Sequence, residues 1–85
     1  MTTTQRLARF ETAQEILVFL MASYSEKIYS EGKKPFPDTS KIAQWNAERK
    51  ALFNLEDGLR LDDQAVIEQV ISDYGPTLRI HFQMK

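Results

Sequence analysis

The fold class is decided by the stretch Thr12-Ala-Gln-Glu-Ile-Leu-Val-Phe-Leu-Met21. Thr12 and Glu15 have the Thr-x-x-Glu spacing of a capping box, in which two side chains satisfy backbone N–H groups at a helix start. Apolar residues then recur at helical spacing, so the sequence predicts a long helix from Thr12 to Glu31 that ends at Gly32. Its apolar stripe consists of Ala13, Ile16, Leu17, Leu20, Met21, Tyr24 and Ile28.

Residues 1–11, before this helix, are ambiguous. Thr2 and Gln5 also have capping-box spacing, which allows an earlier helix start. The same residues are equally compatible with a mobile tail or with a short strand. All three alternatives stay open at this point.

A second helix is expected after the loop that contains Pro35 and Pro37, because two prolines one residue apart remove backbone donors and favour extended geometry. Its N-cap is Asp38, Thr39 or Ser40, and it runs to about Glu56 before Asp57-Gly58 ends it. Its expected apolar stripe consists of Ile42, Trp45, Leu52 and Phe53.

The third predicted helix is capped by Asp62 or Asp63. It runs through Tyr74, where Gly75-Pro76 is expected to stop it. The expected buried face consists of Ala65, Val66, Val70, Ile71 and Tyr74, with Ile67 near its edge.

The pattern changes after Pro76. Apolar and polar residues alternate over residues 78–85, which is the period of a half-buried strand. We therefore predict an extended segment or β-strand over residues 77–85. The alternative is a fourth helix, because proline is acceptable at its first position.

Length and composition indicate one domain over residues 1–85. Apolar residues make up 42% of the chain and charged residues 27%, which is typical of a globular protein. Because the chain lacks cysteine, neither a disulfide framework nor a thiolate zinc site can stabilise it. The expected fold class is mainly α: a small three-helix domain with a long first helix and a short C-terminal β-strand or extended segment.

Neither a membrane span nor a signal peptide is indicated. The longest apolar run, from Ile16 to Met21, is about a third of the length that crosses a bilayer. The polar start of the chain lacks the apolar stretch of a signal peptide. We therefore expect a soluble, cytoplasmic protein that does not contact membranes.

The residues that usually carry catalysis are scarce. His81 is the only histidine and falls on the polar side of the predicted strand, so we interpret it as a surface residue. The pairs Glu56-Asp57 and Asp62-Asp63 lack calcium-loop spacing and suit helix ends. The three glycines follow predicted helices as C-caps and match no phosphate-binding loop. We predict no enzymatic activity, no catalytic residue, no metal, no cofactor and no small-molecule substrate.

Nucleic-acid binding is the alternative function, because the second and third helices have a helix-turn-helix outline. The expected recognition helix, however, carries four acidic residues and no basic residue, which argues against groove insertion. A dimeric nucleic-acid-binding regulator would need Arg6, Arg9, Lys33 and Lys34 to gather on one face.

Protein–protein contact is the function that the pattern favours. Six consecutive apolar residues cover every side of a helix, so Val18 and Phe19 project away from the expected core. Leaving them in water would forfeit roughly 1.5–3 kcal/mol each. Residues 1–11 or the C-terminal segment are the alternative cover. A lone strand also needs a partner. The candidate contact residues are Val18, Phe19, Tyr29, Ile80 and Phe82.

We therefore expect a small interaction module that forms a homodimer, or that binds another protein as an adaptor or inhibitor.

Overall fold

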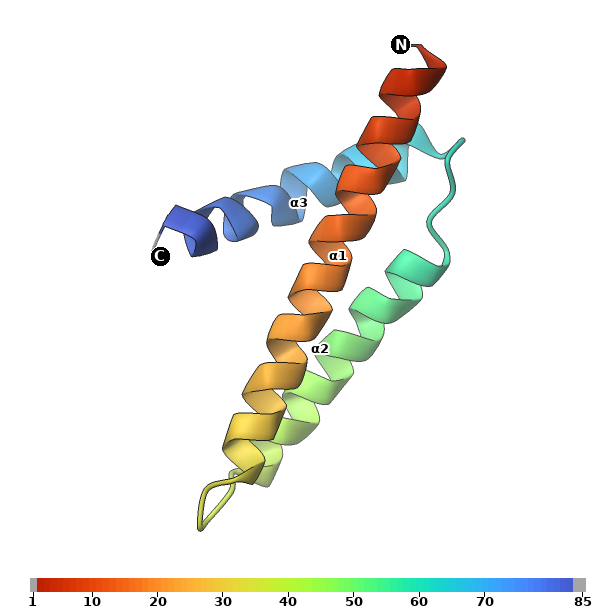
Figure 1. Ribbon diagram of the computed structural model, residues 1–85. Helices are drawn as coiled ribbons and strands as arrows, with labels where there is room; N and C mark the ends of the chain where they lie inside the picture. Colours follow the sequence, from red (N-terminus) through yellow and green to blue (C-terminus); the bar gives the residue numbers. More distant parts are fainter. Residues whose placement is uncertain (1, 84–85) are drawn as a thin grey trace.

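The computed structural model describes residues 2–83, with side chains described through Thr77. Within these residues the chain forms α1 (Thr3–Gly32), α2 (Thr39–Asp57) and α3 (Gln64–Gln83). The prediction of a mainly α, three-helix domain with a long first helix is confirmed. Figure 1 shows α2 antiparallel to the second half of α1, and α3 crossing the first half of α1 at a steep angle.

The start of α1 differs from the predicted one. The Thr2 hydroxyl accepts a hydrogen bond from the Gln5 N–H at 3.1 Å, and the Gln5 side chain accepts one from the Thr2 N–H at 2.8 Å. The start predicted at Thr12 is wrong, because the Thr12 hydroxyl instead donates to the Ala8 carbonyl one turn earlier. Thr2 and Gln5 form the capping box that was the alternative.

The start of α2 is one of the three that the sequence allowed. Asp38 is its N-cap, and the Asp38 carboxylate accepts a hydrogen bond from the Lys41 N–H at 3.1 Å. Glu31, at the end of α1, accepts a hydrogen bond from the Asp38 N–H at 3.0 Å and joins the two helices across the loop. The end before Gly58 also agrees with the prediction.

The path of α3 departs from the prediction at its second half. Asp63 accepts a hydrogen bond from the Val66 N–H at 3.3 Å, as a helix-starting residue does. Gly75 and Pro76 do not stop the helix, which continues to Gln83. Residues 77–83 are thus helical where the alternating pattern indicated an extended segment, and residues 84–85 lie outside those described.

None of the three glycines adopts the conformation that most effectively stops a helix. A glycine ends a helix most effectively in the left-handed conformation, and none of the three glycines has a positive φ. Gly58 is the C-cap of α2 in the right-handed region, whereas Gly32 is the last residue of α1, before the C-cap Lys33, and Gly75 lies inside α3. The predicted C-cap role is therefore wrong for Gly32 and Gly75. Pro76 lacks an N–H group and loses one backbone hydrogen bond, which the rest of the helix tolerates.

The core lies where α1 meets the other two helices. The buried apolar side chains among those described are Ala13, Ile16, Leu17, Leu52, Leu59, Ile67 and Val70. Three predictions about burial are wrong. Ile67 is central to the core, because Ile67, Val70 and Tyr74 share one face of α3 at helical spacing. Ala65 and Phe53 are exposed because their helices turn other residues towards α1.

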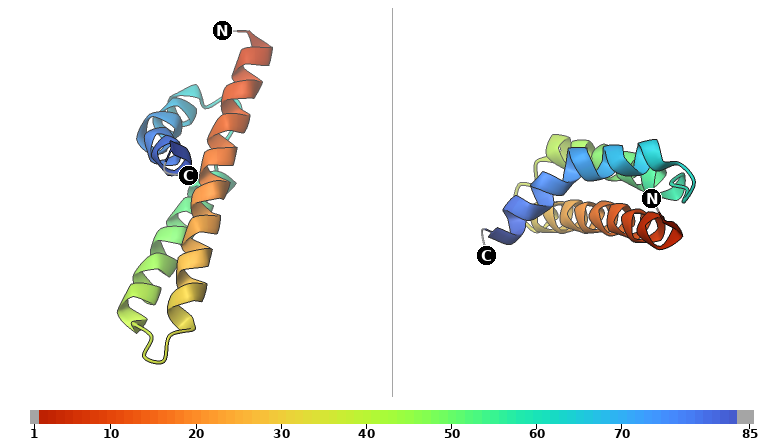
Figure 2. Two further views of the ribbon diagram at one scale, coloured as in Figure 1. Left: turned by 60° about the vertical axis from the view of Figure 1, so that its left-hand side comes forward. Right: turned by 90° about the horizontal axis from the view of Figure 1, so that it is seen from above.

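The molecule is thin and elongated. Within the described residues, α1 packs against both α2 and α3, whereas α2 and α3 make no helix–helix packing with each other. The right-hand view in Figure 2, from above, shows α1 along one side, with α2 and the first part of α3 on the other. The radius of gyration is 15.0 Å, against about 12 Å for a compact chain of this length. The smallest extent is 15 Å, so much of α1 has no second layer in front of it.

The exposed surface agrees with this shape. The chain exposes 6221 Å², whereas a compact monomer of the same mass exposes about 5,200 Å². The excess, about 1,000 Å², is comparable to the roughly 800 Å² that one partner contributes to a standard specific protein–protein interface.

Candidate interaction surface

Three of the five candidate contact residues have described side chains. Val18 is 53% exposed and Tyr29 is 64% exposed, whereas Phe19 is half-buried. Residues 3–11 extend α1 and do not fold over it, so Val18 stays uncovered by the N-terminal residues. The side chains of Ile80 and Phe82 lie outside those described. Contact of these residues with a partner stays a prediction.

An apolar row along α1 includes a residue that sequence reasoning missed. Leu7, Val18 and Tyr29 are equally spaced along the chain. Each step is close to three helical turns, so the three residues lie on one side of α1. Leu7 is 44% exposed. It was missed because residues 1–11 were not assigned to a helix. The equal spacing of the three residues was the signal that could have found it.

This row borders a groove between α1 and α2, here called the α1–α2 groove. Its acidic end, a hollow of about 530 Å³, is lined by Glu11, Gln14, Glu15, Val18, Phe19 and Glu56. Its basic end, about 520 Å³, is lined by Met21, Ser25, Asn46, Arg49, Lys50 and Phe53. Val18 and Met21 are one turn apart on α1, as are Phe53 and Glu56 on α2, so the two hollows adjoin along both helices.

The basic end is held in place by hydrogen bonds. One Arg49 guanidinium nitrogen donates to the Ser25 hydroxyl at 2.9 Å, and the other donates to the Asn46 side-chain oxygen at 2.8 Å. Phe53, 54% exposed, adds apolar surface beside this guanidinium. The ammonium of Lys33 lies 4.3 Å from the centre of the Tyr29 ring, a cation–π contact that extends the positive charge along α1.

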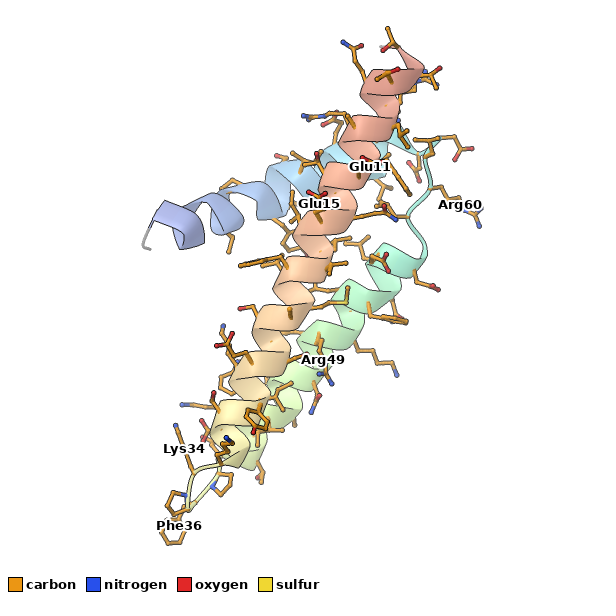
Figure 3. All side chains as sticks on the ribbon, viewed as in Figure 1. Glu11, Glu15, Lys34, Phe36, Arg49 and Arg60 are labelled. Atoms are coloured by element: carbon orange, nitrogen blue, oxygen red, sulfur yellow. The ribbon has the colours of Figure 1, made fainter. Side chains whose placement is uncertain are left out.

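The acidic end carries three carboxylates around Val18. Glu11 and Glu15 are exposed and Glu56 is half-buried. The two ion pairs within the described part of the chain involve none of these glutamates, nor Arg49 or Lys50. Figure 3 shows Glu11 and Glu15 on the upper half of α1, and Arg49 lower down between α1 and α2. The groove therefore combines an apolar middle with opposite charges at its ends.

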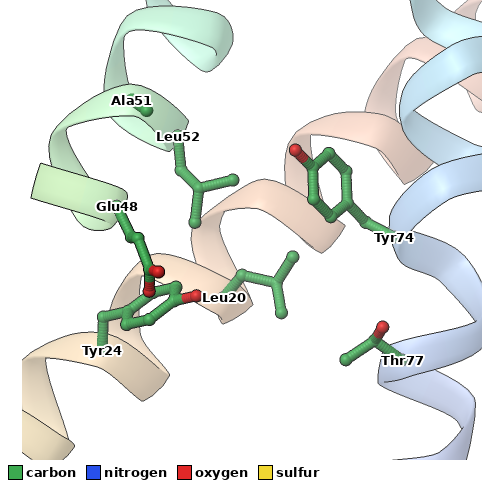
Figure 4. A pocket seen from close by; sticks show the side chains of 7 residues that line it. All are labelled: Leu20, Tyr24, Glu48, Ala51, Leu52, Tyr74 and Thr77. Atoms are coloured by element: carbon green, nitrogen blue, oxygen red, sulfur yellow. The ribbon is translucent and has the colours of Figure 1, made fainter. Parts of the chain in front are cut away.

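A cavity of about 390 Å³ lies on another side of α1, where it meets α2 and α3. Its lining residues are Leu20, Tyr24, Glu48, Ala51, Leu52, Tyr74 and Thr77. Burial raises the pKa of the Tyr24 phenol, and the neighbouring Glu48 carboxylate raises it further (Figure 4). A neutral phenol beside a carboxylate is a hydrogen-bond donor.

The four basic residues of the nucleic-acid hypothesis do not gather within one chain. Arg6 and Arg9 lie near the start of α1, and Lys33 and Lys34 follow its end, about 40 Å away along the helix. Arg9 is paired with Glu68, and Lys34 with Glu31. Their positive charge is thus divided and partly neutralised.

The described residues were also considered as metal ligands and as membrane-spanning helices. Among the described residues, no group of three or more His, Cys, Asp or Glu side chains is placed to hold a metal ion. The helices of residues 2–83 include none with the length and apolar character needed to cross a membrane. The side chain of His81 lies outside those described.

No protein-family model, curated protein or solved structure matches this chain. The chemistry of the α1–α2 groove is therefore the basis for assigning a function.

Proposed function

We propose that this chain is a small, non-enzymatic protein-interaction module that uses the α1–α2 groove as its contact surface. It acts by pairing with itself, or by binding another protein as an adaptor or inhibitor. The observation that carries the proposal is the exposed apolar row along α1, with the exposed Phe53 of α2 in the groove beside it.

Burial of this surface would stabilise an assembly. Each large apolar side chain taken fully out of water contributes roughly 1.5–3 kcal/mol. About half of each of Val18, Tyr29 and Phe53 is still available for burial by a partner. An apolar surface bordered by charged residues is typical of a protein–protein contact site.

The test combines light scattering after size-exclusion chromatography with binding of the dye ANS. We expect the wild-type chain to self-associate at micromolar concentration, or to bind ANS as a monomer if its partner is another protein. Val18→Asp and Phe53→Asp should each abolish both signals. Phe36→Asp is the matched control, because Phe36 is 92% exposed but lies in the loop outside the groove. A wild-type monomer that binds no ANS would contradict the proposal.

A further inference from the structure

We propose that the occupant of the α1–α2 groove is a second copy of this chain, paired antiparallel about a two-fold axis that passes close to Val18. This inference rests on the proposed function and specifies its partner. A two-fold interface repeats every contact, so residue i of one copy meets residue j of the other and the reverse. The groove has the symmetry that such pairing requires.

The apolar row is symmetric about Val18. Leu7 precedes Val18 by the same number of residues as Tyr29 follows it. Each step corresponds to about 16 Å along the helix axis. In an antiparallel pair, Val18 therefore meets the partner's Val18, while Leu7 meets the partner's Tyr29. All three side chains are available, because each is at least 44% exposed.

The charged residues are also placed evenly about Val18, but the two sides carry opposite signs. Glu11 lies two helical turns before Val18, and Ser25, which holds the Arg49 guanidinium, lies two turns after it. Antiparallel pairing thus places Glu11 beside the partner's Arg49 and the partner's Lys50. Parallel pairing would place like charges together at both ends.

Self-complementarity is the reason for choosing a second copy over another protein. A groove shaped for a different protein needs neither equal apolar spacing on both sides of one residue nor opposite charges at matching distances. Here both occur along one groove, and the apolar middle lies between them.

The available area fits a weak, reversible dimer. The row from Leu7 to Tyr29 is about 33 Å long. Its face is about 20 Å wide where α2 flanks the second half of α1, and about 10 Å wide along the first half. The interface would bury about 1,000 Å² over both copies, in the range of weak and transient protein–protein contacts. Association should therefore depend on concentration in the micromolar range.

One group opposes the pairing. Glu56 lines the groove next to Val18 and so lies near the proposed axis, where its carboxylate approaches the partner's Glu56. Removing this charge with Glu56→Gln should tighten the dimer severalfold. Weaker association of the Glu56→Gln variant would count against the axis at Val18.

Cysteine cross-linking tests the register, because the chain has no cysteine of its own. Under oxidising conditions Val18→Cys should form a disulfide dimer. Leu7→Cys mixed with Tyr29→Cys should cross-link to each other, and neither variant should cross-link with itself. Phe36→Cys measures random collision, since its side chain is more exposed than any of these but lies outside the groove. Self-linking of Leu7→Cys would show parallel pairing and overturn the inference.

Charge reversal tests the pairing of the two ends. Glu11→Lys places like charges together twice in a dimer, and Lys50→Glu does the same, so each variant alone should associate about tenfold more weakly or worse. A mixture of the two variants restores two unlike contacts, and it should form a heterodimer of near wild-type affinity that weakens as salt rises. Failure of the mixture to associate better than either variant alone would overturn the antiparallel arrangement.

The two proposals fail in different ways. If the wild-type chain dimerises and Val18→Asp abolishes dimerisation, but the cross-links are parallel, the interaction surface stands and the register is wrong. A wild-type monomer that binds ANS through the groove overturns self-pairing and leaves binding of another protein. A monomer without ANS binding overturns both.

Discussion

Arg9 on α1 and Glu68 on α3 form a two-point ion pair between helices that are far apart in sequence. The Arg9 Nε donates to one Glu68 oxygen at 3.0 Å, while a terminal guanidinium nitrogen donates to the other oxygen. Such paired bonds fix orientation as well as distance. The hydrogen bond from Arg9, with its positive charge, lowers the pKa of Glu68 from its ordinary value. This contact anchors the start of α3 to the first half of α1.

The first prediction concerns this pair. Arg9→Glu and Glu68→Arg should each lower the urea midpoint of unfolding, because each places like charges together. The double variant should recover most of the loss. Both side chains are partly exposed, so the recovery should shrink as salt is added. Urea titrations of the four proteins at low and high salt provide the measurement. Equal midpoints for all four proteins at low salt would show that the pair does not anchor α3.

The second prediction concerns pH and Glu31, which is 5% exposed. The hydrogen bond from the Asp38 N–H, and that from the Lys34 ammonium, lower the pKa of Glu31. A carboxyl with a lowered folded-state pKa contributes stability above its unfolded-state pKa, about 4.3, and loses it as pH falls through the folded-state pKa. Glu31→Gln should therefore be less stable than wild type at neutral pH, and the difference should disappear in acid.

Urea midpoints measured over a pH series provide the check for Glu31. Glu26→Gln, at an exposed position of the same helix, is the control for removing a charge alone. A difference between wild type and Glu31→Gln that stays constant from neutral pH into acid would rule out the proposed linkage.

The third prediction concerns the path of α3 through Gly75. A Cβ at this position would lie 3.9 Å from the Ile71 Cγ2 and 4.0 Å from the Ile16 Cδ1, both ordinary contacts. Gly75→Ala should therefore stabilise the protein by about 0.5–1 kcal/mol, since alanine loses less backbone entropy in a helix. Thermal melts and helical circular dichroism measure this. Destabilisation would show that Gly75 needs a conformation outside the right-handed helix.

The fourth prediction concerns the core. Leu17 is fully buried in the cluster shared by all three helices. Leu17→Ala should destabilise the protein by about 2–5 kcal/mol, because it removes apolar contacts and leaves a cavity. Phe36→Ala should change stability by less than about 0.5 kcal/mol. Denaturant unfolding of both variants gives the comparison, and similar losses for the two would contradict this description of the core.

Local patterns predicted the second helix well and the first helix in part. Asp38 caps α2 as expected, because a cap depends on hydrogen bonds within three residues of the helix start. The local pattern could not decide whether α1 starts at Thr2 or at Thr12. Thr2 with Gln5 and Thr12 with Glu15 both have the spacing of a capping box. Contacts made by Arg9 and Phe10 favour the earlier start, and those contacts involve distant parts of the chain.

The candidate surface, too, was predicted only where it depends on local sequence. The exposure of Val18 was predicted, because successive residues of a helix are turned by about 100° and Val18 falls outside the stripe. The groove was not predicted, because Glu11 and Arg49 are far apart in sequence. Only the packing of α2 against α1 brings both residues to the same surface. Leu7 was missed for the related reason that its helix was not assigned.

The sequence by itself thus determined three features: the helical fold class, the side of α1 that faces the core, and the position of Val18 outside that side. All three depend on interactions between residues that are close in sequence. The tertiary structure alone decided the course of α3 beyond Gly75, the central place of Ile67 and the opposite charges at the ends of the α1–α2 groove. The physical reason is that helix placement follows from side-chain packing between residues distant in sequence, which no local pattern specifies.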